Sequence, residues 1–210
     1  TDGRKYRYVE NGGTALEEGK IVSSEAPAAH HDEDLAVATA AVGSKTLTVT
    51  LEGTEAAKNL YAEGYVFMNL PTLATTGGSR PMYKIRSHPY AAGSATLELT
   101  LDEDDGLVVA VTNSTETAGL IKSPYKDIVV APGAIVGRYV GVTPITIAAN
   151  YFGWVQVAGL CAAALDGNVA MGTVVGSSGT HPGSFVAVGA DVTSAIGRVH
   201  GKVGVNDEWH

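Results

Sequence analysis

Five neighbouring side chains that can bind metal ions lie in the run His30, His31, Asp32, Glu33 and Asp34. Neighbouring side chains of an extended chain point to opposite faces, so only alternate members of the run can share one site. Tetrahedral zinc usually takes ligands two to four residues apart together with a second pair elsewhere, and the remaining histidines are scattered. We interpret residues 27–34 as a polar linker rather than a zinc or calcium site, and we predict no bound metal or cofactor.

A second acidic run, at Asp102, Glu103, Asp104 and Asp105, is followed by Gly106. A calcium loop of the EF-hand type needs acidic residues at alternate positions, a glycine in sixth place and a glutamate in twelfth. Four consecutive acidic residues do not follow that pattern. We predict a charged hairpin turn between two strands, whose charge also limits aggregation at a sheet edge.

The residues that could act as nucleophiles lack the neighbours that would activate them. Cys161 lies in the apolar run VAGLCAAAL, where the nearest charged residue is the acidic Asp166, whereas a reactive thiolate needs a basic group nearby. The serines of VGSSGT, residues 175–180, do not match the G-x-S-x-G spacing of a nucleophile elbow. We interpret Cys161 as a buried structural thiol and residues 175–180 as a hairpin tip, and we predict that the protein is not an enzyme.

The one cluster of basic and aromatic residues is Arg4, Lys5, Tyr6, Arg7 and Tyr8. In a strand the two tyrosines would share one face with Arg4, and Lys5 and Arg7 would share the other. Such interleaving can stack nucleic-acid bases. The chain, however, carries 14 basic against 22 acidic residues and a net charge of −8, without the basic surface that nucleic-acid binding requires. We predict no direct nucleic-acid binding, and a terminal strand that pairs with a neighbouring subunit.

The polarity of the chain argues against a membrane protein. No run reaches the roughly 18 apolar residues of a membrane span, because Gln156, Asp166 and Asn168 interrupt the most apolar stretch, residues 151–175. The polar N-terminus TDGRKYRYVENGG lacks the apolar stretch of a secretory signal. We therefore expect no membrane association.

The elements that position these residues are predicted to be strands. Residues 45–51 and 95–101 alternate leucine or valine with threonine or glutamate, as strands with one buried and one solvated face do. Further candidate strands recur at a spacing typical of sandwiches and barrels, in residues 64–70, 82–88, 106–112, 127–133, 134–142, 144–149, 153–160, 168–175, 184–190 and 195–205. We predict an all-β protein: an antiparallel sandwich or barrel-like domain with an extended N-terminal arm and hairpins.

Two local patterns refine this prediction. Residues 54–64 contain good helix formers, with Thr54 as a cap and Gly64 as a stop, which predicts one or two helical turns. Within residues 151–175, Asp166-Gly167-Asn168 is a strong hairpin signal. We expect a buried strand before that turn, with Trp154 in the core, and a returning strand after it.

Composition also suggests how the chain is divided. Residues 1–26 mix charge and glycine, and we interpret them as an N-terminal arm or edge hairpin. Residues 27–210 form a β-rich domain in this interpretation. Charge falls and glycine rises beyond Asp127, which places a second, internal boundary near residues 125–130.

Four segments resemble, in this order, structural proteins of tailed bacteriophages: DGRKYRYVENGGTALEEGKIV, GGSRPMYKIRSHPYAAGSATLELTL, SPYKDIVVAPG and ITIAANYFGWVQVAGLCAAALDGNVAMGTVV. The resemblance is to a small head protein, often encoded beside the major capsid protein and interpreted as a capsid decoration or cement protein. It covers most of the chain and rests on YKIRSH, SPY and YFGWVQ. The final segment GRVHGKVGVNDEWH departs from the smoother strands of such relatives, so its role is not implied.

The resemblance implies a virion protein without catalytic activity that binds the outer surface of the expanded phage capsid and stabilises it. Its partner would be the major capsid protein, and it would be present in the host cytoplasm during assembly. It would act as a homo-oligomer, a dimer or trimer. The expected capsid-binding or partner-binding residues are those of the arm: Arg4, Lys5, Tyr6, Arg7 and Tyr8.

Two other classes of function stay open at this point. A tail or fibre component would share the β-rich composition and differ in position and copy number. A carbohydrate-binding or hydrolytic β-domain would use surface aromatic residues together with acids from 102–105. The candidate aromatic residues are Tyr6, Tyr8, Tyr83, Tyr90 and Trp209.

Overall fold

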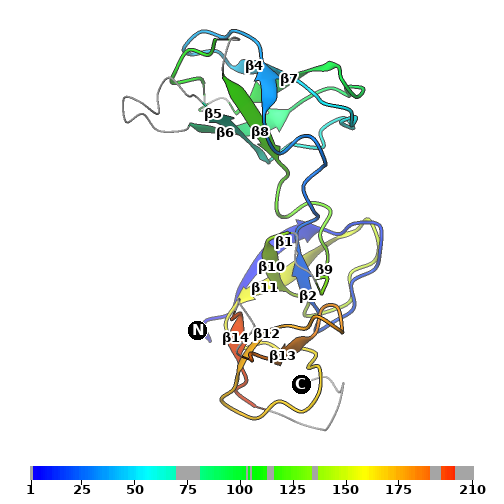
Figure 1. Cartoon of the computed structure of the whole chain (residues 1–210). Coiled ribbons are helices and arrows are strands. Elements are labelled where there is room, and N and C mark those ends of the chain that lie inside the picture. The colour runs from blue at the N-terminus through cyan, green and yellow to red at the C-terminus, as the bar shows by residue number, and fades with distance from the viewer. Residues whose placement is uncertain are drawn as a thin grey trace. The chain divides into compact units, whose positions relative to one another are not determined.

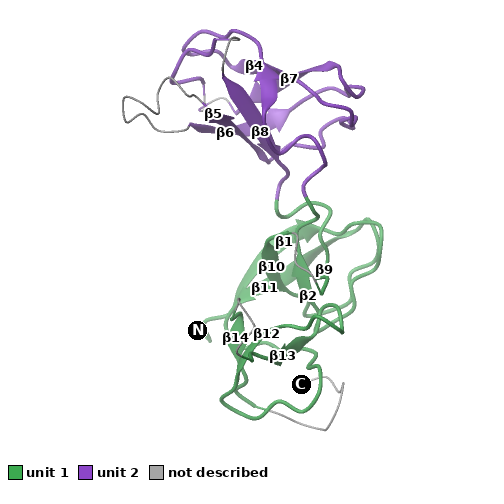
Figure 2. Ribbon diagram, viewed as in Figure 1, with its two compact units in different colours: residues 1–26, 124–210 green, residues 27–123 purple. Residues whose placement is uncertain are grey.

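The computed structural model describes residues 2–69, 81–102, 104, 106–112, 116–133, 137–189 and 195–201. Every regular element in these residues is a β-strand, fourteen in all, and the strands pair antiparallel within their sheets (Figure 1). The all-β class predicted from the sequence is confirmed. The chain divides into two compact units: residues 1–26 and 124–210 form unit 1, and residues 27–123 form unit 2 (Figure 2).

Unit 2 is a closed six-stranded barrel with the strand order β3-β4-β7-β6-β5-β8, closed by pairing between β8 and β3. Its strands are β3 (Leu35–Val37), β4 (Thr46–Thr50), β5 (Tyr65–Asn69), β6 (Met82–Ser87), β7 (Thr96–Leu101) and β8 (Thr117–Ile121). Leu47 and Val49 of β4 are buried between outward-facing threonines, as the twofold periodicity of a strand requires. Closure leaves this barrel without the open edge of a sheet.

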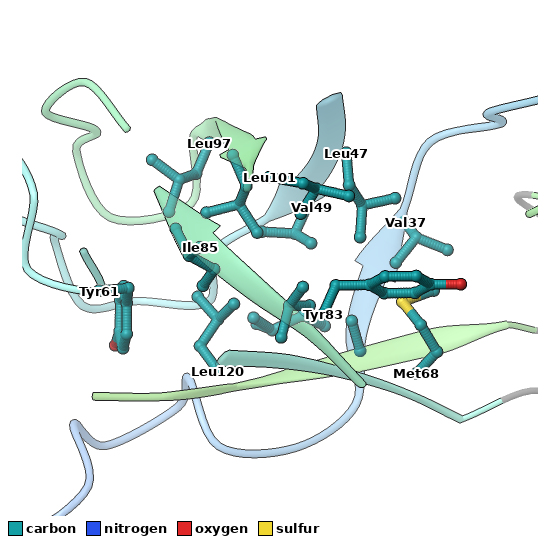
Figure 3. Close-up of a cluster of buried hydrophobic side chains, with 14 of the residues drawn as sticks. Val37, Leu47, Val49, Tyr61, Met68, Tyr83, Ile85, Leu97, Leu101 and Leu120 are labelled. Carbon is teal, nitrogen blue, oxygen red and sulfur yellow. The ribbon is translucent and has the colours of Figure 1, made fainter. Parts of the chain in front are cut away.

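One hydrophobic core fills the barrel. All six strands send side chains into it, and Figure 3 shows Leu47, Ile85 and Leu120, from three different strands, pointing into the same interior. Most of these side chains have no more than a few per cent of their surface exposed. The alternating apolar residues recognised in residues 45–51 and 95–101 therefore point into the interior of the barrel.

Unit 1 is built on a five-stranded antiparallel sheet with the order β1-β11-β10-β2-β9. Its strands are β1 (Lys5–Glu10), β2 (Ile21–Ser23), β9 (Val129–Val130), β10 (Tyr139–Val142) and β11 (Phe152–Ala158). The edge strand β1 and strand β11 are far apart in the sequence but lie side by side, blue beside yellow in Figure 1. Residues 1–26, expected to form an arm or edge hairpin, thus contribute an edge strand and an inner strand to this sheet.

A second, three-stranded sheet of order β13-β12-β14 completes unit 1. It comprises β12 (Val174–Ser177), β13 (Phe185–Ala187) and β14 (Gly197–Arg198). One core of unit 1 contains Val9, Val22 and Val155 of the five-stranded sheet. The other core joins Ile21 and Val142 to Val175 and Phe185 of the small sheet. The two cores occupy opposite faces of the larger sheet, because Ile21 and Val22 are neighbours in one strand.

The helix predicted for residues 54–64 is absent, because the barrel uses the backbone groups that a helix would need. The N–H of Tyr61 donates to His88 Nε2 at 2.9 Å, and the N–H of Glu63 donates to the Ile85 carbonyl at 2.8 Å. Asn59 and Glu63 adopt left-handed backbone angles, with φ near 60°, which end any helical turn. Tertiary hydrogen bonds therefore override the local helix propensity.

The hairpin predicted within residues 151–175 is also wrong. Asp166 and Gly167 do form a bend, and Gly167 has a φ of 77°. The strands on either side, β11 and β12, belong to different sheets: β11 pairs with β1 and β10, and β12 pairs with β13 and β14. The sequence pattern predicted the local turn correctly. It did not predict strand pairing, because the partner of a strand is determined by residues elsewhere in the chain.

Two further expectations concern turns. The acidic run at residues 102–105 was expected to be a hairpin turn leading directly into a second strand. β7 ends at Leu101, but the next strand, β8, begins only at Thr117. Residues 106–112, predicted as a strand, contribute one isolated bridge from Val111 to Ala40. Glu103 and Asp105 lie outside the described residues. Residues 178–184 connect β12 to its hairpin partner β13. The hairpin tip expected at residues 175–180 is therefore correct only in part, because residues 175–177 belong to β12.

Candidate functional site

Four exposed aromatic side chains line one face of the β1–β11 pair. Tyr8 lies directly opposite Trp154, and Phe152 lies two pairs further along, opposite Glu10. Tyr6, opposite Gln156, extends the row on the same face. We call Tyr6, Tyr8, Phe152 and Trp154 the aromatic surface.

The rings of the aromatic surface pack against one another rather than into a core. Tyr8 stacks on Phe152, with 5.6 Å between ring centroids and 6° between ring planes, and it meets Trp154 at 5.1 Å and 59°. Tyr8, Phe152 and Trp154 are 53%, 57% and 54% exposed. The expectation that Trp154 fills the core is therefore wrong: its neighbour Val155 is fully buried and faces the core, while Trp154 faces outward.

The aromatic surface continues a face that is covered elsewhere in unit 1. Val142 pairs with Gln156, and Val142 packs into the core shared with the small sheet. The small sheet therefore covers the part of this face near β2 and β10. Large exposed aromatic residues in a neighbouring group are characteristic of binding surfaces.

Strand β1 also presents an open sheet edge. The N–H of Asn11 donates to the Tyr151 carbonyl, toward β11, whereas the N–H of Glu10 donates to the Tyr125 carbonyl on the opposite side. Because backbone groups alternate in direction along an antiparallel strand, the N–H and C=O of Tyr6 and Tyr8 point away from β11. Within the described residues, no backbone hydrogen bond to these outward groups is found.

Basic side chains flank the open edge. The backbone N–H of Arg4 donates to Asp2, and its guanidinium forms an ion pair with the same carboxylate at 2.5 Å; these two hydrogen bonds lower the pKa of Asp2. The guanidinium of Arg7 lies 4.1 Å from the centroid of the Tyr125 ring, in cation–π geometry. Arg4, Lys5 and Arg7 are all exposed. The edge is therefore positively charged in a chain that is acidic as a whole.

A cavity of about 680 Å³ opens between the two sheets of unit 1. Its wall is mainly apolar and includes Val142, Leu165 and Phe185, with Cys161 and Arg198 at its surface. Burial raises the pKa of the Cys161 thiol, which keeps this cysteine protonated and unreactive near neutral pH. Cys161 was expected to be a buried structural thiol, but its side chain is only partly buried.

A group of polar side chains surrounds Asp166 in unit 1. Ser178 donates its hydroxyl hydrogen to the carboxylate, Thr180 donates to the same oxygen at 2.9 Å, and His181 Nδ1 lies 2.8 Å from the other oxygen. The hydrogen bond from Ser178, followed by those from His181 and Thr180, lowers the pKa of Asp166. A catalytic serine must give its proton to an imidazole, and here it faces the carboxylate. This group clamps the β12–β13 connection onto the bend at Asp166.

Two histidines of unit 2 are buried around Tyr61. Tyr61 donates its hydroxyl hydrogen to His31 Nδ1 at 2.5 Å, and His31 Nε2 donates to the Thr54 carbonyl at 2.9 Å. His88 Nε2 accepts from the Tyr61 N–H, and its Nδ1 donates to the Pro89 carbonyl at 2.7 Å. His31 is fully buried, unlike the other residues of the predicted polar linker 27–34, which are exposed or partly exposed. The two imidazoles are structural members of the barrel.

No cluster of three or more histidine, cysteine or acidic side chains in metal-binding geometry occurs among the described residues. The same residues contain no helix long and apolar enough to cross a membrane. The aromatic residues considered for carbohydrate binding are divided between the two units: Tyr83, which is buried in the barrel, and Tyr90 belong to unit 2, and Tyr6 and Tyr8 belong to unit 1. Trp209 lies outside the described residues.

The predicted partner-binding residues Arg4, Lys5, Tyr6, Arg7 and Tyr8 are all exposed on or next to β1. Sequence reasoning missed Phe152, which joins the aromatic surface from β11. A signal for it existed: Phe152 and Trp154 alternate along the sequence as Tyr6 and Tyr8 do. Two aromatic rows with the same twofold period can share one sheet face, but only the register between β1 and β11 brings them together.

Comparisons of the chain with protein-family models, with curated proteins and with solved structures found no match.

Proposed function

We propose that this chain is a structural virion protein, without catalytic activity, that binds the outer surface of a tailed-phage capsid and stabilises it. The observation that carries the proposal is the aromatic surface beside an open, basic sheet edge. Aromatic side chains are enriched in the energetically dominant centres of protein interfaces, and this group has no covering element among the described residues. The resemblance of the sequence to capsid decoration proteins supplies the identity of the partner, the major capsid protein.

A capsid lattice suits a binding surface of this modest size. Each copy needs only one interface, because many copies on one shell act together and link neighbouring subunits. A homo-oligomer on the capsid, a dimer or trimer, would raise the number of linked contacts further. In this proposal the protein is present in the host cytoplasm during assembly and on the capsid exterior afterwards.

The first test is the copy number of the chain in purified virions, relative to the major capsid protein, by quantitative mass spectrometry. A ratio near one, or a simple fraction set by shell symmetry, supports capsid decoration. A ratio of a few per cent would assign the protein to the tail or fibre, which is the second candidate function. Absence from virions would overturn both assignments.

The second test asks whether the aromatic surface is the binding surface. Purified heads lacking the protein are mixed with the wild type or with Trp154→Ala, and bound protein is measured after sedimentation. We expect Trp154→Ala to weaken binding by about tenfold or more, the loss that one interface hot spot produces. Tyr90→Ala, which removes an exposed aromatic ring from unit 2, is the matched control and should bind normally. Equal binding by both variants would exclude this surface.

A further inference from the structure

We propose that strand β1 accepts an added strand from the major capsid protein, and that this strand is acidic on the face toward Lys5 and Arg7 and apolar on the face toward the aromatic surface. The inference rests on the proposed function and specifies how the partner is bound. It follows from three observations: the direction of the backbone groups of β1, the place where its open edge ends, and the charge along it.

The backbone geometry defines the pairing. The outward N–H and C=O groups of Tyr6 and Tyr8 are spaced as one side of an antiparallel or parallel ladder, and an added strand would lie about 4.8 Å from β1. The open edge is short, because the segment that follows Tyr125 occupies it at Glu10: Glu10 donates to the Tyr125 carbonyl and accepts from the Ile128 N–H. An added strand therefore covers Arg4 to Tyr8 and ends before Glu10.

The side-chain pattern defines the chemistry of the added strand. Lys5 and Arg7 project to one face of β1 and Tyr6 and Tyr8 to the other, because strand side chains alternate. Side chains directly across a strand pair are close enough to interact, and opposite charges stabilise the pair. A strand with acidic residues at one set of alternate positions and apolar residues at the other complements both faces.

A second copy of the chain fits this edge poorly. If two β1 strands pair about a twofold axis through the outward groups of Tyr6 and Tyr8, Arg7 lies opposite either Arg7 or Lys5 of the other copy. Like charges directly across a strand pair are destabilising. The charge pattern therefore favours an acidic partner strand over self-association through this edge.

Hydrogen exchange measured on the full chain, free and bound to purified heads, tests the added strand directly. In the free protein we expect the outward amides of Tyr6 and Tyr8 to exchange rapidly, and binding should slow them by about tenfold or more. The amides of Arg7 and Val9 point toward β11 and serve as internal controls. Binding to heads without added protection at Tyr6 and Tyr8 would overturn the inference and leave the proposed function intact.

Two variants of Tyr8 distinguish the contribution of its backbone N–H to binding from that of its aromatic ring. Tyr8→Ala removes the aromatic ring and keeps the outward N–H, whereas Tyr8→Pro removes both. Proline is tolerated at an edge position whose N–H points away from the sheet, and protection of the Arg7 and Val9 amides verifies that β1 still pairs with β11. We expect Tyr8→Pro to bind heads at least about fivefold more weakly than Tyr8→Ala, the effect of one lost hydrogen bond. Equal binding would contradict strand addition.

Charge is tested with synthetic peptides, which do not depend on capsid binding. The probes are a labelled eight-residue peptide of alternating glutamate and valine and its lysine–valine counterpart, with binding followed by fluorescence anisotropy. We expect the acidic peptide to bind the wild type and to lose about tenfold in affinity for Lys5→Glu, while Lys58→Glu, an exposed charge reversal in unit 2, has no effect. If heads do not bind but the acidic peptide does, the proposed function fails and the acidic-strand site stands. If the acidic peptide does not bind, or the lysine peptide binds equally well, the acidic-strand inference fails.

Discussion

The two units bury their strands in different ways. Unit 2 closes six strands into a barrel around one core, so every strand of it has two neighbours. Within its described residues, unit 1 has an open five-stranded sheet with two edges, and the small second sheet covers only part of one face. Closure satisfies the hydrogen-bonding groups of the strands internally, whereas an open sheet leaves an edge and a face available to a partner. In our proposal the closed barrel supplies stability and the open sheet supplies the binding surface.

The two units also differ in net charge. Unit 2 contains six basic and twelve acidic residues, whereas unit 1 contains eight basic and ten acidic residues. Three of the basic residues of unit 1 are Arg4, Lys5 and Arg7, at the open edge. Most of the net negative charge therefore belongs to the closed unit, where it favours solubility, and the open unit carries a local positive site.

The largest expected effect is in the barrel core. Leu99→Ala should lower the free energy of unfolding of unit 2 by about 3–4 kcal/mol, because Leu99 is fully buried and the cavity left behind adds to the lost apolar transfer. The same substitution at the cavity wall of unit 1, Leu165→Ala, should cost about 2 kcal/mol, since Leu165 is less completely enclosed. Hydrogen exchange in urea reports the two units separately. An equal or larger loss at Leu165 would contradict the difference in packing between the units.

The clamp around Asp166 gives unit 1 a dependence on pH. Asp166→Asn should lower the free energy of unfolding by about 1–2 kcal/mol at neutral pH, because Ser178, Thr180 and His181 lose the carboxylate that they bind. The pKa of Asp166 is lowered in the folded protein, so its contribution is full above the unfolded pKa of about 3.9 and is lost as the pH falls through the lowered folded pKa.

Urea denaturation at neutral pH and in steps down to about pH 2 measures this contribution. The difference between the wild type and Asp166→Asn should disappear at the acidic end. Glu18→Gln, an exposed change in unit 1, is the control and should have no effect. A gap that stays constant with pH would mean that the Asp166 charge does not stabilise the fold.

The buried tyrosine of unit 2 provides a comparison within the barrel. Tyr61→Phe removes the hydroxyl that donates to His31, leaves a buried acceptor unsatisfied, and should cost about 1–2 kcal/mol. Tyr90→Phe removes an exposed hydrogen bond to Glu55 and should leave stability almost unchanged. Thermal denaturation measures the melting temperatures of both variants. Similar melting temperatures would refute a structural role for the hydrogen bond between Tyr61 and His31.

The smallest expected effect belongs to the aromatic surface. Trp154→Ala should lower the free energy of unfolding by about 1 kcal/mol or less, because the ring is half exposed. A core tryptophan would cost about 3–5 kcal/mol. Val155→Ala, at the next residue but on the buried face, should cost about 2 kcal/mol despite the smaller side chain. If urea denaturation shows a larger loss in free energy of unfolding for Trp154→Ala than for Val155→Ala, the tryptophan must be buried in the core.

Sequence reasoning was most successful for properties that do not depend on which strands lie beside one another. The alternation in residues 45–51 and 95–101 predicted β4 and β7 within a residue or two at each end, since twofold periodicity is a local property. It failed at residues 54–64, where the N–H groups of Tyr61 and Glu63 bond to His88 and Ile85 instead of forming a helix. No local pattern reveals such distant acceptors.

The sequence by itself determined the all-β class, the positions of most strands, and the exposed basic and aromatic residues at the N-terminus. Only the tertiary structure decided which face of each strand is covered and which strand lies beside it. Trp154 and His31 show the reason. Alternation divides a strand into two faces without saying which one meets a core, and burial of a histidine depends on acceptors and donors supplied by residues far along the chain. Pairing between β1 and β11 joins the two chain segments that make up unit 1, and that pairing creates the candidate binding surface.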